Sequence, residues 1–176
     1  GRDKLAEPMD GRRLLDRAVE AVRAVASEVV IVAAPGAELR APKGVLVAYD
    51  PRPFEGPLAG LAAGLAALPP DVDRVLVVGA DMPTLVVPVL ERLVRGLEAR
   101  EGVVLADDVR PRPLPLAVRS SPASAAADRL LAGGERRLRA LLSELDVDVI
   151  PATTWRVDDP DGSTLRDIDL PTDLQG

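Results

Sequence analysis

A chain of 176 residues with 47% hydrophobic and 28% charged residues has the size and composition of one globular domain, and we expect a single domain over residues 1–176. The net charge of −6 at pH 7 argues against binding to nucleic acid or to an anionic membrane, because both need a basic surface. These residues include no Cys and no His, which excludes disulfides, thiolate metal sites and imidazole catalysis within them.

Helix-like and strand-like segments alternate along the chain. The predicted elements are, in chain order, a helix over 14–26, strands over 28–33 and 45–49, a helix over 58–68, a strand over 75–79, a helix over 87–98, strands over 102–106 and 114–118, helices over 123–131 and 135–144, a strand over 147–150 and the start of a last helix over 170–174. Irregular, Pro-rich connections are expected over 49–57 and 107–115. Such alternation is typical of parallel β-α-β units, so we predict an α/β fold with a mostly parallel sheet and helices on both faces.

The sequence begins at Gly1 without a methionine, and residues 1–4 have the composition of the end of a loop. We therefore expect a first strand to be missing from the start of this sequence. No stretch has the length and hydropathy of a transmembrane helix, and no signal peptide is found, so we expect a cytoplasmic protein.

Segment 75–84 contains the most informative carboxylate of the chain. Residues 75–79 form an apolar run that predicts a buried strand, and Pro83 with the apolar residues after it predicts the start of a helix. Asp81 then lies at the carboxyl edge of a sheet, where open α/β folds bind ligands. A carboxylate there suits a hard cation such as Mg²⁺, which prefers one or two carboxylates together with substrate phosphates. The structural alternative is an Asp that caps the following helix.

A second candidate site lies at the start of the next predicted helix upstream. Gly56 precedes Pro57 at this helix start. Gly60 and Gly64 follow one helical turn apart, so either a nucleotide or a neighbouring strand could approach the backbone closely. Asp50 ends the preceding predicted strand and faces the same edge if the sheet is parallel.

Two segments nearer the C-terminus carry further charged candidates. Asp167 and Asp169 flank Ile168, so both carboxylates point to one face of an extended strand. One of them could complete a magnesium site with Asp81, and capping of the last helix is the alternative. Residues 133–139 contain three arginines near a predicted helix start, which suits either phosphate recognition or a solvated helix face.

Lys4 is a weaker candidate at the start of the sequence. A lysine after a glycine-containing loop can reach phosphate oxygens, although most lysines near a chain end are simply solvated. The chain has neither a Gly-x-Gly-x-x-Gly nor a Gly-Lys-Ser/Thr motif, so the fingerprints of dinucleotide-binding folds and of P-loop enzymes are absent.

Seven motifs in sequence order resemble those of one enzyme family. They are Gly-Arg-Asp-Lys4, the strand that ends at Asp50, Gly-Pro-Leu-Ala-Gly60, Ala-Asp-Met-Pro83, Arg-Pro-Leu-Pro-Leu116, Gly-Glu-Arg-Arg137 and the segment from Asp167 to Leu174. The chain resembles the molybdenum cofactor guanylyltransferases, MobA-like members of the nucleotidyltransferases of glycosyltransferase-A-like fold. The resemblance spans the whole chain and implies a three-layer Rossmann-like domain, in which a first strand and a Gly-rich loop precede Gly1.

The resemblance implies transfer of GMP from GTP to the terminal phosphate of molybdopterin, with release of pyrophosphate. By the matching motifs, Lys4 would contact the nucleotide phosphates and take part in catalysis. Asp50 and Gly56 would line the nucleoside pocket, and Pro57 and Leu58 belong to the same nucleotide-binding motif.

The resemblance also implies a Mg²⁺ cofactor. Asp81 would bind the metal ion and take part in catalysis, and Asp169 lies where relatives place an Asn or Asp near the metal. Arg136 and Arg137 would lie towards the phosphate of the pterin acceptor. GTP and molybdopterin are the expected substrates, and transient contact with molybdoenzymes or cofactor chaperones is expected from the resemblance alone.

Two features depart from the guanylyltransferase pattern. The ending Asp-Ile-Asp169-Leu-Pro replaces an Asn-x-Asn-Thr-Pro and is closer to molybdopterin cytidylyltransferases and phospholactate guanylyltransferases, and Asp-Met-Pro-Thr-Leu85 also occurs in the cytidylyltransferase branch. The motifs at Lys4, Gly60 and Arg137 are guanylyltransferase-like, so we expect GTP rather than CTP. The alternatives from other classes are a non-catalytic nucleotide-binding module of the same fold and a sugar-phosphate nucleotidyltransferase.

Overall fold

The computed structural model describes residues 8–9, 12–50 and 56–166. Its elements are β1 (Pro8–Met9), β2 (Arg12–Arg13), α1 (Leu14–Arg23), β3 (Val30–Ala33), β4 (Leu46–Tyr49), α2 (Pro57–Ala67), β5 (Arg74–Val77), α3 (Val87–Gly96), β6 (Gly102–Ala106), β7 (Pro111–Arg119), α4 (Ser120–Ala132), the 3-10 helix η2 (Leu138–Ser143), β8 (Val147–Ile150), α5 (Ala152–Trp155) and the 3-10 helix η3 (Ser163–Leu165). In the described part of the chain, no helix is long and apolar enough to cross a membrane.

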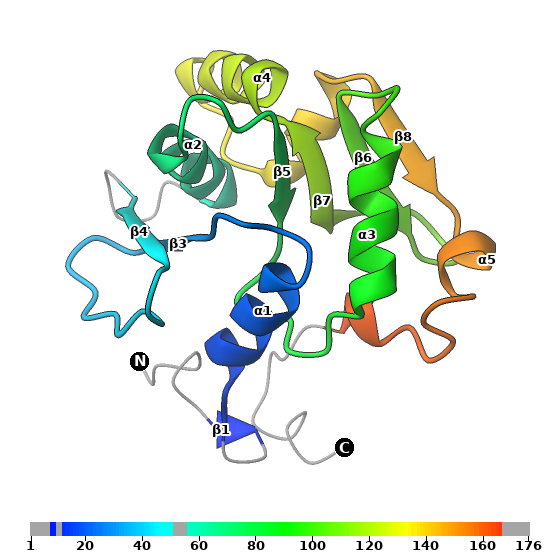
Figure 1. The fold of residues 1–176 in the computed structure, drawn as a ribbon. Coiled ribbons are helices and arrows are strands. Elements are labelled where there is room, and N and C mark those ends of the chain that lie inside the picture. The colour runs from blue at the N-terminus through cyan, green and yellow to red at the C-terminus, as the bar shows by residue number, and fades with distance from the viewer. Residues whose placement is uncertain (1–7, 10–11, 51–55, 167–176) are drawn as a thin grey trace.

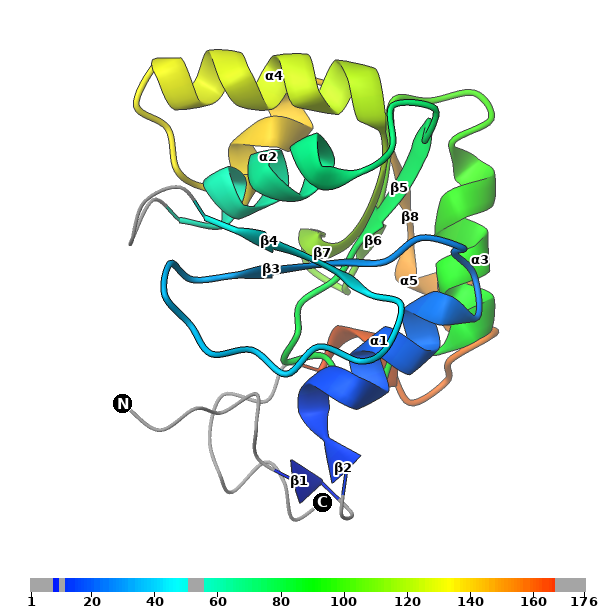
Figure 2. The ribbon, with the colours of Figure 1, turned by 60° about the vertical axis from the view of Figure 1, so that its left-hand side comes forward.

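The elements form three layers (Figure 1). Helices α2 and α4 cover one face of the β-structure, and α1 and α3 lie on the other face (Figure 2). Successive side chains of a strand point to opposite faces of the sheet. Val104 and Leu116 belong to the core on the side of α2 and α4, whereas Val103 and Leu105 belong to the core on the side of α3. The predicted α/β class with helices on both faces is confirmed.

The central sheet has the strand order β5-β7-β6-β8. Strand β7 is antiparallel to both β5 and β6, whereas β6 and β8 are parallel. Strands β5, β6 and β8 therefore point in one direction, and their carboxyl ends lie at one edge. The predicted mostly parallel arrangement of these strands is confirmed, with β7 as the antiparallel exception. Strand β7 runs in the opposite direction because residues 107–110 alone join β6 to β7, and a parallel return needs a crossover of about a dozen residues or more.

Strands β3 and β4 form a separate parallel pair, bonded to no other described strand. Helix α2 packs against both strands and returns the chain from β4 to β5, so β3, β4 and β5 run in the same direction. Between β3 and β5 lies an apolar cavity of about 310 Å³, lined by side chains of both strands and of α1 and α2. The described residues do not test the strand and Gly-rich loop that the resemblance places before Gly1.

Most predicted elements are confirmed to within a few residues, and the strands over 102–106 and 147–150 have the predicted bounds. Three predictions needed correction. Strand β7 begins at Pro111, inside the connection that was expected to be irregular, and the helix expected over 135–144 is the shorter 3-10 helix η2. The helix after Asp81 begins at Val87, as the range 87–98 predicted, and the interpretation that Pro83 opens this helix is wrong. The predicted last helix lies outside the described residues.

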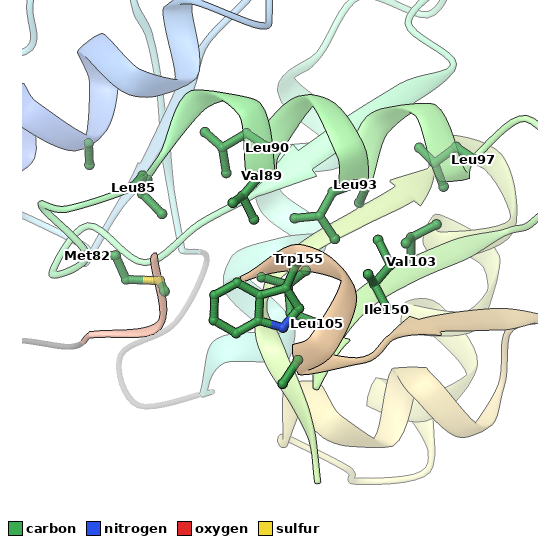
Figure 3. Packing of buried hydrophobic residues seen from close by; sticks show 13 residues of the cluster. Met82, Leu85, Val89, Leu90, Leu93, Leu97, Val103, Leu105, Ile150 and Trp155 are labelled. Atoms are coloured by element: carbon green, nitrogen blue, oxygen red, sulfur yellow. The ribbon is translucent and has the colours of Figure 1, made fainter. Parts of the chain in front are cut away.

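A tightly packed core fills the space between α3 and the sheet (Figure 3). The face of α3 that carries Val89, Leu90 and Leu93 is completely buried against strand residues such as Val103. Trp155 of the short helix α5 lies in the same cluster, and its indole N–H donates to the carbonyl of Ala106 at 2.8 Å. Its polar group is therefore satisfied although the side chain is fully buried.

Candidate active site

Asp81 lies on a loop that leaves the carboxyl end of β5. The Oδ1 atom of Asp81 lies so close to Gly79 that any side chain at position 79 would displace it. The backbone N–H of Gly79 contacts the Sδ atom of Met82 at 3.4 Å, and the buried side chain of Met82 anchors the loop in the core. Asp81 is not a helix cap, because α3 has Val86 as its N-cap residue. The capping alternative is therefore wrong, and the partly exposed carboxylate remains available for a ligand.

The far end of the Asp81 loop is held by the turn that contains η3. The hydroxyl of Thr84 donates to the carbonyl of Ser163 at 2.7 Å, and the N–H of Val86 donates to the hydroxyl of Thr164 at 3.2 Å. The buried carboxylate of Asp159 orders this turn by accepting from the N–H groups of Ser163, at 3.0 Å, and Thr164, at 2.7 Å. The chain therefore passes directly beside the Asp81 loop shortly before the segment that contains Asp167 and Asp169.

The first turn of α2 is built around Gly56. Its φ of 82° lies in the region that favours glycine, and Pro57 occupies the first helical turn. A Cβ atom at Gly56 would lie 2.9 Å from the carbonyl oxygen of Arg136. The same carbonyl accepts from the N–H of Leu58 at 3.2 Å. The structure thus brings the predicted nucleotide-binding motif into contact with the predicted acceptor-binding segment.

Of the other glycines of α2, Gly64 allows the close packing of this helix against β3. A Cβ atom at Gly64 would lie 3.1 Å from Cγ2 of Val32 on β3, and one at Gly60 would lie 3.9 Å from Cγ1 of the same residue. Close helix–strand packing therefore explains Gly64, as the structural alternative predicted. Asp50 follows β4, and its N–H continues the ladder by donating to the carbonyl of Ala33 at 2.9 Å.

The segment after α4 contains a carboxylate to which the sequence assigned no role. Atom Oε1 of Glu135 accepts from the N–H groups of Arg136, at 2.8 Å, and Arg137, at 2.9 Å. The guanidinium of Arg137 donates to both oxygens of Glu135, with Nε–Oε1 at 3.0 Å and Nη2–Oε2 at 2.7 Å. Above all the guanidinium of Arg137, and then the two backbone N–H groups, lower the pKa of Glu135 to about 2. The turn-forming glycines and the arginines around Glu135 are the sequence signal that could have identified it.

The two arginines of this segment have different surroundings. Nη1 of Arg136 donates to the carbonyls of Leu131, at 3.2 Å, and Glu135, at 3.0 Å, so this guanidinium stabilises the end of α4. The side chain of Arg137 is 81% exposed beside Glu135. Arg137 is therefore the better placed of the two for a ligand phosphate.

Part of the start of α2 and the loop before Asp81 border one cavity. The cavity between β3 and β5 is lined by Pro57 of α2 and by Ala80, the neighbour of Asp81. Its walls are mainly apolar, so the charged triphosphate of a nucleotide does not fit its interior. Lys4 and Asp169 lie outside the described residues.

The donor set fits Mg²⁺ in part. Within residues 8–9, 12–50 and 56–166, no group of three or more metal-binding side chains is found. Asp81 supplies a carboxylate at a strand end, and Mg²⁺ needs only one or two protein carboxylates when substrate phosphates and water complete its coordination.

Comparison with known sequences identifies the family. Residues 1–149 match the family described as the MobA-like NTP transferase domain. A protein of Chloroflexus aggregans named probable molybdenum cofactor guanylyltransferase is 33% identical over 169 residues, which cover 94% of this chain and 79% of that protein. A Mycobacterium tuberculosis protein of the same name is 34% identical over 150 residues, which cover 83% of this chain and 74% of that protein.

Solved structures confirm the fold. Molybdopterin-guanine dinucleotide biosynthesis protein A from Archaeoglobus fulgidus matches with a TM-score of 0.77 at 22% identity, covering 99% of this chain and 88% of that one. The 2-C-methyl-D-erythritol 4-phosphate cytidylyltransferase of Thermus thermophilus matches with a TM-score of 0.75 at 19% identity, covering 98% of this chain and 90% of that one. Because the family match extends over residues 1–149 and two relatives share about a third of their residues with it, the chain belongs to the MobA-like NTP transferase domain family and is a nucleotidyltransferase.

Proposed function

We propose that this nucleotidyltransferase transfers GMP from GTP to the terminal phosphate of molybdenum-loaded molybdopterin. The observation that carries the proposal is the strand-end carboxylate of Asp81, on a loop that borders the same cavity as the first turn of α2. The relatives named molybdenum cofactor guanylyltransferase support this choice of substrates. The relation to that family also makes a cytoplasmic location and transient contact with molybdoenzymes or cofactor chaperones part of the proposal.

The reaction needs positioning and charge neutralisation more than a covalent protein group. An oxygen of the acceptor phosphate attacks the α-phosphorus of GTP, the bond from that phosphorus to the bridging oxygen breaks, and pyrophosphate leaves. A phosphate monoester is already largely ionised near pH 7, so the attack requires no strong protein base. A chain without His and Cys is sufficient for this chemistry.

Asp81 and Asp169 would hold Mg²⁺, and Lys4 would offset the negative charge that develops on the leaving pyrophosphate. Bound Mg²⁺ would supply charge neutralisation at the phosphate oxygens. The described chain ends beside the Asp81 loop, because hydrogen bonds to Ser163 and Thr164 hold its last turn there. This supports the choice of a carboxylate from the segment that follows.

The nucleoside would bind at the start of α2, near Asp50 and Gly56. Pro57 is exposed there, whereas the side chain of Leu58 is completely buried and its N–H is bonded to Arg136. We therefore assign ligand contact to Pro57 and a supporting role to Leu58. For the acceptor phosphate, Arg137 is the stronger candidate, because the guanidinium of Arg136 already caps α4.

The test is Mg²⁺-dependent release of pyrophosphate by the purified chain, with molybdenum-loaded molybdopterin and either GTP or CTP. Release with GTP alone is expected, and it should be abolished in Asp81→Asn but retained in Asp128→Asn, a matched control on the exposed side of α4. Release with CTP alone would replace the proposal with cytidylyl transfer. Nucleotide binding without turnover would identify a non-catalytic module.

A further inference from the structure

The loop over residues 135–137 follows α4 in the chain and contacts the start of α2, a helix far away in the sequence (Figure 2). We propose that Glu135 is a positioning residue of the nucleotide site, whose carboxylate fixes the carbonyl of Arg136 on the first turn of α2. The inference rests on the proposed function for its catalytic consequence. Its structural part stands on the described contacts alone.

The backbone of Glu135 is fixed by the end of α4. The N–H of Glu135 donates to the carbonyl of Leu130 at 2.9 Å, and the preceding Gly134 has the positive φ of 86° that allows the chain to turn. Because the main chain is held in this way, the carboxylate has a defined position from which to accept hydrogen bonds.

The side chain of Glu135 fixes the two residues that follow. Its oxygens accept from the N–H groups of Arg136 and Arg137 and from two nitrogen atoms of the Arg137 guanidinium. Hydrogen bonds to a charged group are stronger than those between neutral groups, so one carboxylate sets the conformation of the whole loop.

The conformation of the loop determines how α2 begins. The carbonyl of Arg136 accepts from the N–H of Leu58 and fills the space where a side chain at position 56 would lie. It thus satisfies one of the N–H groups that a helix start leaves without an intrahelical partner. If the carboxylate of Glu135 were lost, Arg136 would be held only by the hydrogen bonds of its own guanidinium, and the turn that contains Gly56 and Pro57 would lose part of its support.

Amide hydrogen exchange at Leu58 tests the structural part without any substrate. In Glu135→Ala, we expect exchange of this amide to accelerate about tenfold, as befits the loss of hydrogen bonds to a charged group. Glu135→Gln retains an oxygen that can accept from the backbone N–H groups, so its exchange should stay within about threefold of the wild-type rate. The matched control is Glu144→Ala, which removes the nearby exposed pair of Glu144 with Arg129 and should leave Leu58 unchanged.

Steady-state kinetics tests the catalytic consequence. In Glu135→Ala, we expect KM for GTP to rise about tenfold while kcat stays within about threefold, and Glu135→Gln should restore most of the lost affinity. Unchanged exchange at Leu58 in Glu135→Ala, or faster exchange spread equally over β6 and β7, would overturn the inference.

The two proposals can fail separately. If the wild-type chain turns over GTP but Glu135→Ala has normal Leu58 exchange and normal KM, the positioning role is wrong and the proposed function stands. If Leu58 responds as expected but the wild-type chain turns over no nucleotide, the proposed function is wrong, and the role of Glu135 at α2 is supported.

Discussion

The two sides of the described β-structure differ in how completely they are covered. On the side of β6 and β8, which we call the closed half, Leu93, Leu97 and Trp155 have no exposed surface. On the side of β3 and β4, the open half, Leu46 is 43% exposed and Tyr49 is 51% exposed. The difference indicates that the closed half stabilises the fold, whereas the open half borders the site.

The pairing of the strands explains this difference. Strand β6 is paired on both edges, by β7 and β8, and its side chains are buried on both faces. Among the described residues, β3 pairs only with β4, and its other edge borders the cavity towards β5. Asp81 follows β5, the strand between these halves, and its neighbour Ala80 lines the cavity.

Trp155→Ala should produce the largest loss of stability, because it empties a large site in the closed half. We expect a decrease of about 3–5 kcal/mol in the free energy of unfolding, the usual range for a buried aromatic residue. Urea unfolding followed by circular dichroism measures this decrease. A decrease below about 1 kcal/mol would show that the closed half repacks easily, and would contradict its role as the more tightly packed half.

Gly79→Ala, at the border between the halves, should lower activity strongly and stability only slightly. The added Cβ would displace Oδ1 of Asp81, the end of a flexible side chain, and would lie 3.1 Å from Cγ and 3.3 Å from Sδ of Met82. Met82 must then shift by a few tenths of an ångström, so we expect only a small cost to folding. A displaced carboxylate should nevertheless lower kcat about a hundredfold in the pyrophosphate assay. Gly133→Ala is the control, because its Cβ would meet nothing closer than 3.4 Å. Full activity in Gly79→Ala would contradict the role of Asp81.

Ile31→Ala compares the open half with the closed half directly. Ile31 lines a cavity that already exists, so we expect a loss at the lower end of the usual range, about 2 kcal/mol. Leu93→Ala, the matched change in the closed half, should cost about 2–5 kcal/mol. Equal losses in the two variants, measured by urea unfolding, would show that the open half is as well packed as the closed half.

The smallest effect should come from acid titration of Glu135. Its pKa in the folded chain is about 2, below the ordinary value of 4.5, so the ionised carboxylate stabilises the folded state. This contribution is complete above about pH 4.5 and is lost as the pH falls towards 2. The difference in unfolding free energy between the wild type and Glu135→Gln should therefore shrink over that range. A difference independent of pH would assign the effect to packing and not to charge.

The sequence predicted that Asp81 follows a strand, because an apolar run that ends in a short polar residue has a strong local signal. The prediction that this strand is buried was wrong, since β5 is exposed at Arg74 and only half-buried over the rest of its length. It could not predict the contact between Arg136 and Leu58, which depends on how two distant helices pack. Arg136 and Arg137 are adjacent in the sequence and look equivalent, yet only the folded chain shows that one guanidinium caps α4.

The strand errors also have a physical origin. Prolines at 111, 113 and 115 predicted an irregular connection, but the segment forms the first half of β7. The pairing of β6 with β7 accommodates these prolines because its register is interrupted between Val104 and Ala106, and proline, which has no N–H to donate, occurs in strands at such irregularities. Helix α5 has four residues, too few for a periodic pattern, so no local signal indicated that Trp155 would complete the core.

The placement of Trp155 gives the protein a natural pair of optical reporters. The chain has one Trp, buried in the closed half, and one Tyr, Tyr49, exposed at the end of β4 in the open half. Indole emission therefore reports on the environment of one half, and phenol absorbance reports on the other. If both signals change at the same urea concentration, the two halves unfold as one cooperative unit, and an earlier change at Tyr49 would identify the open half as the part that loosens first.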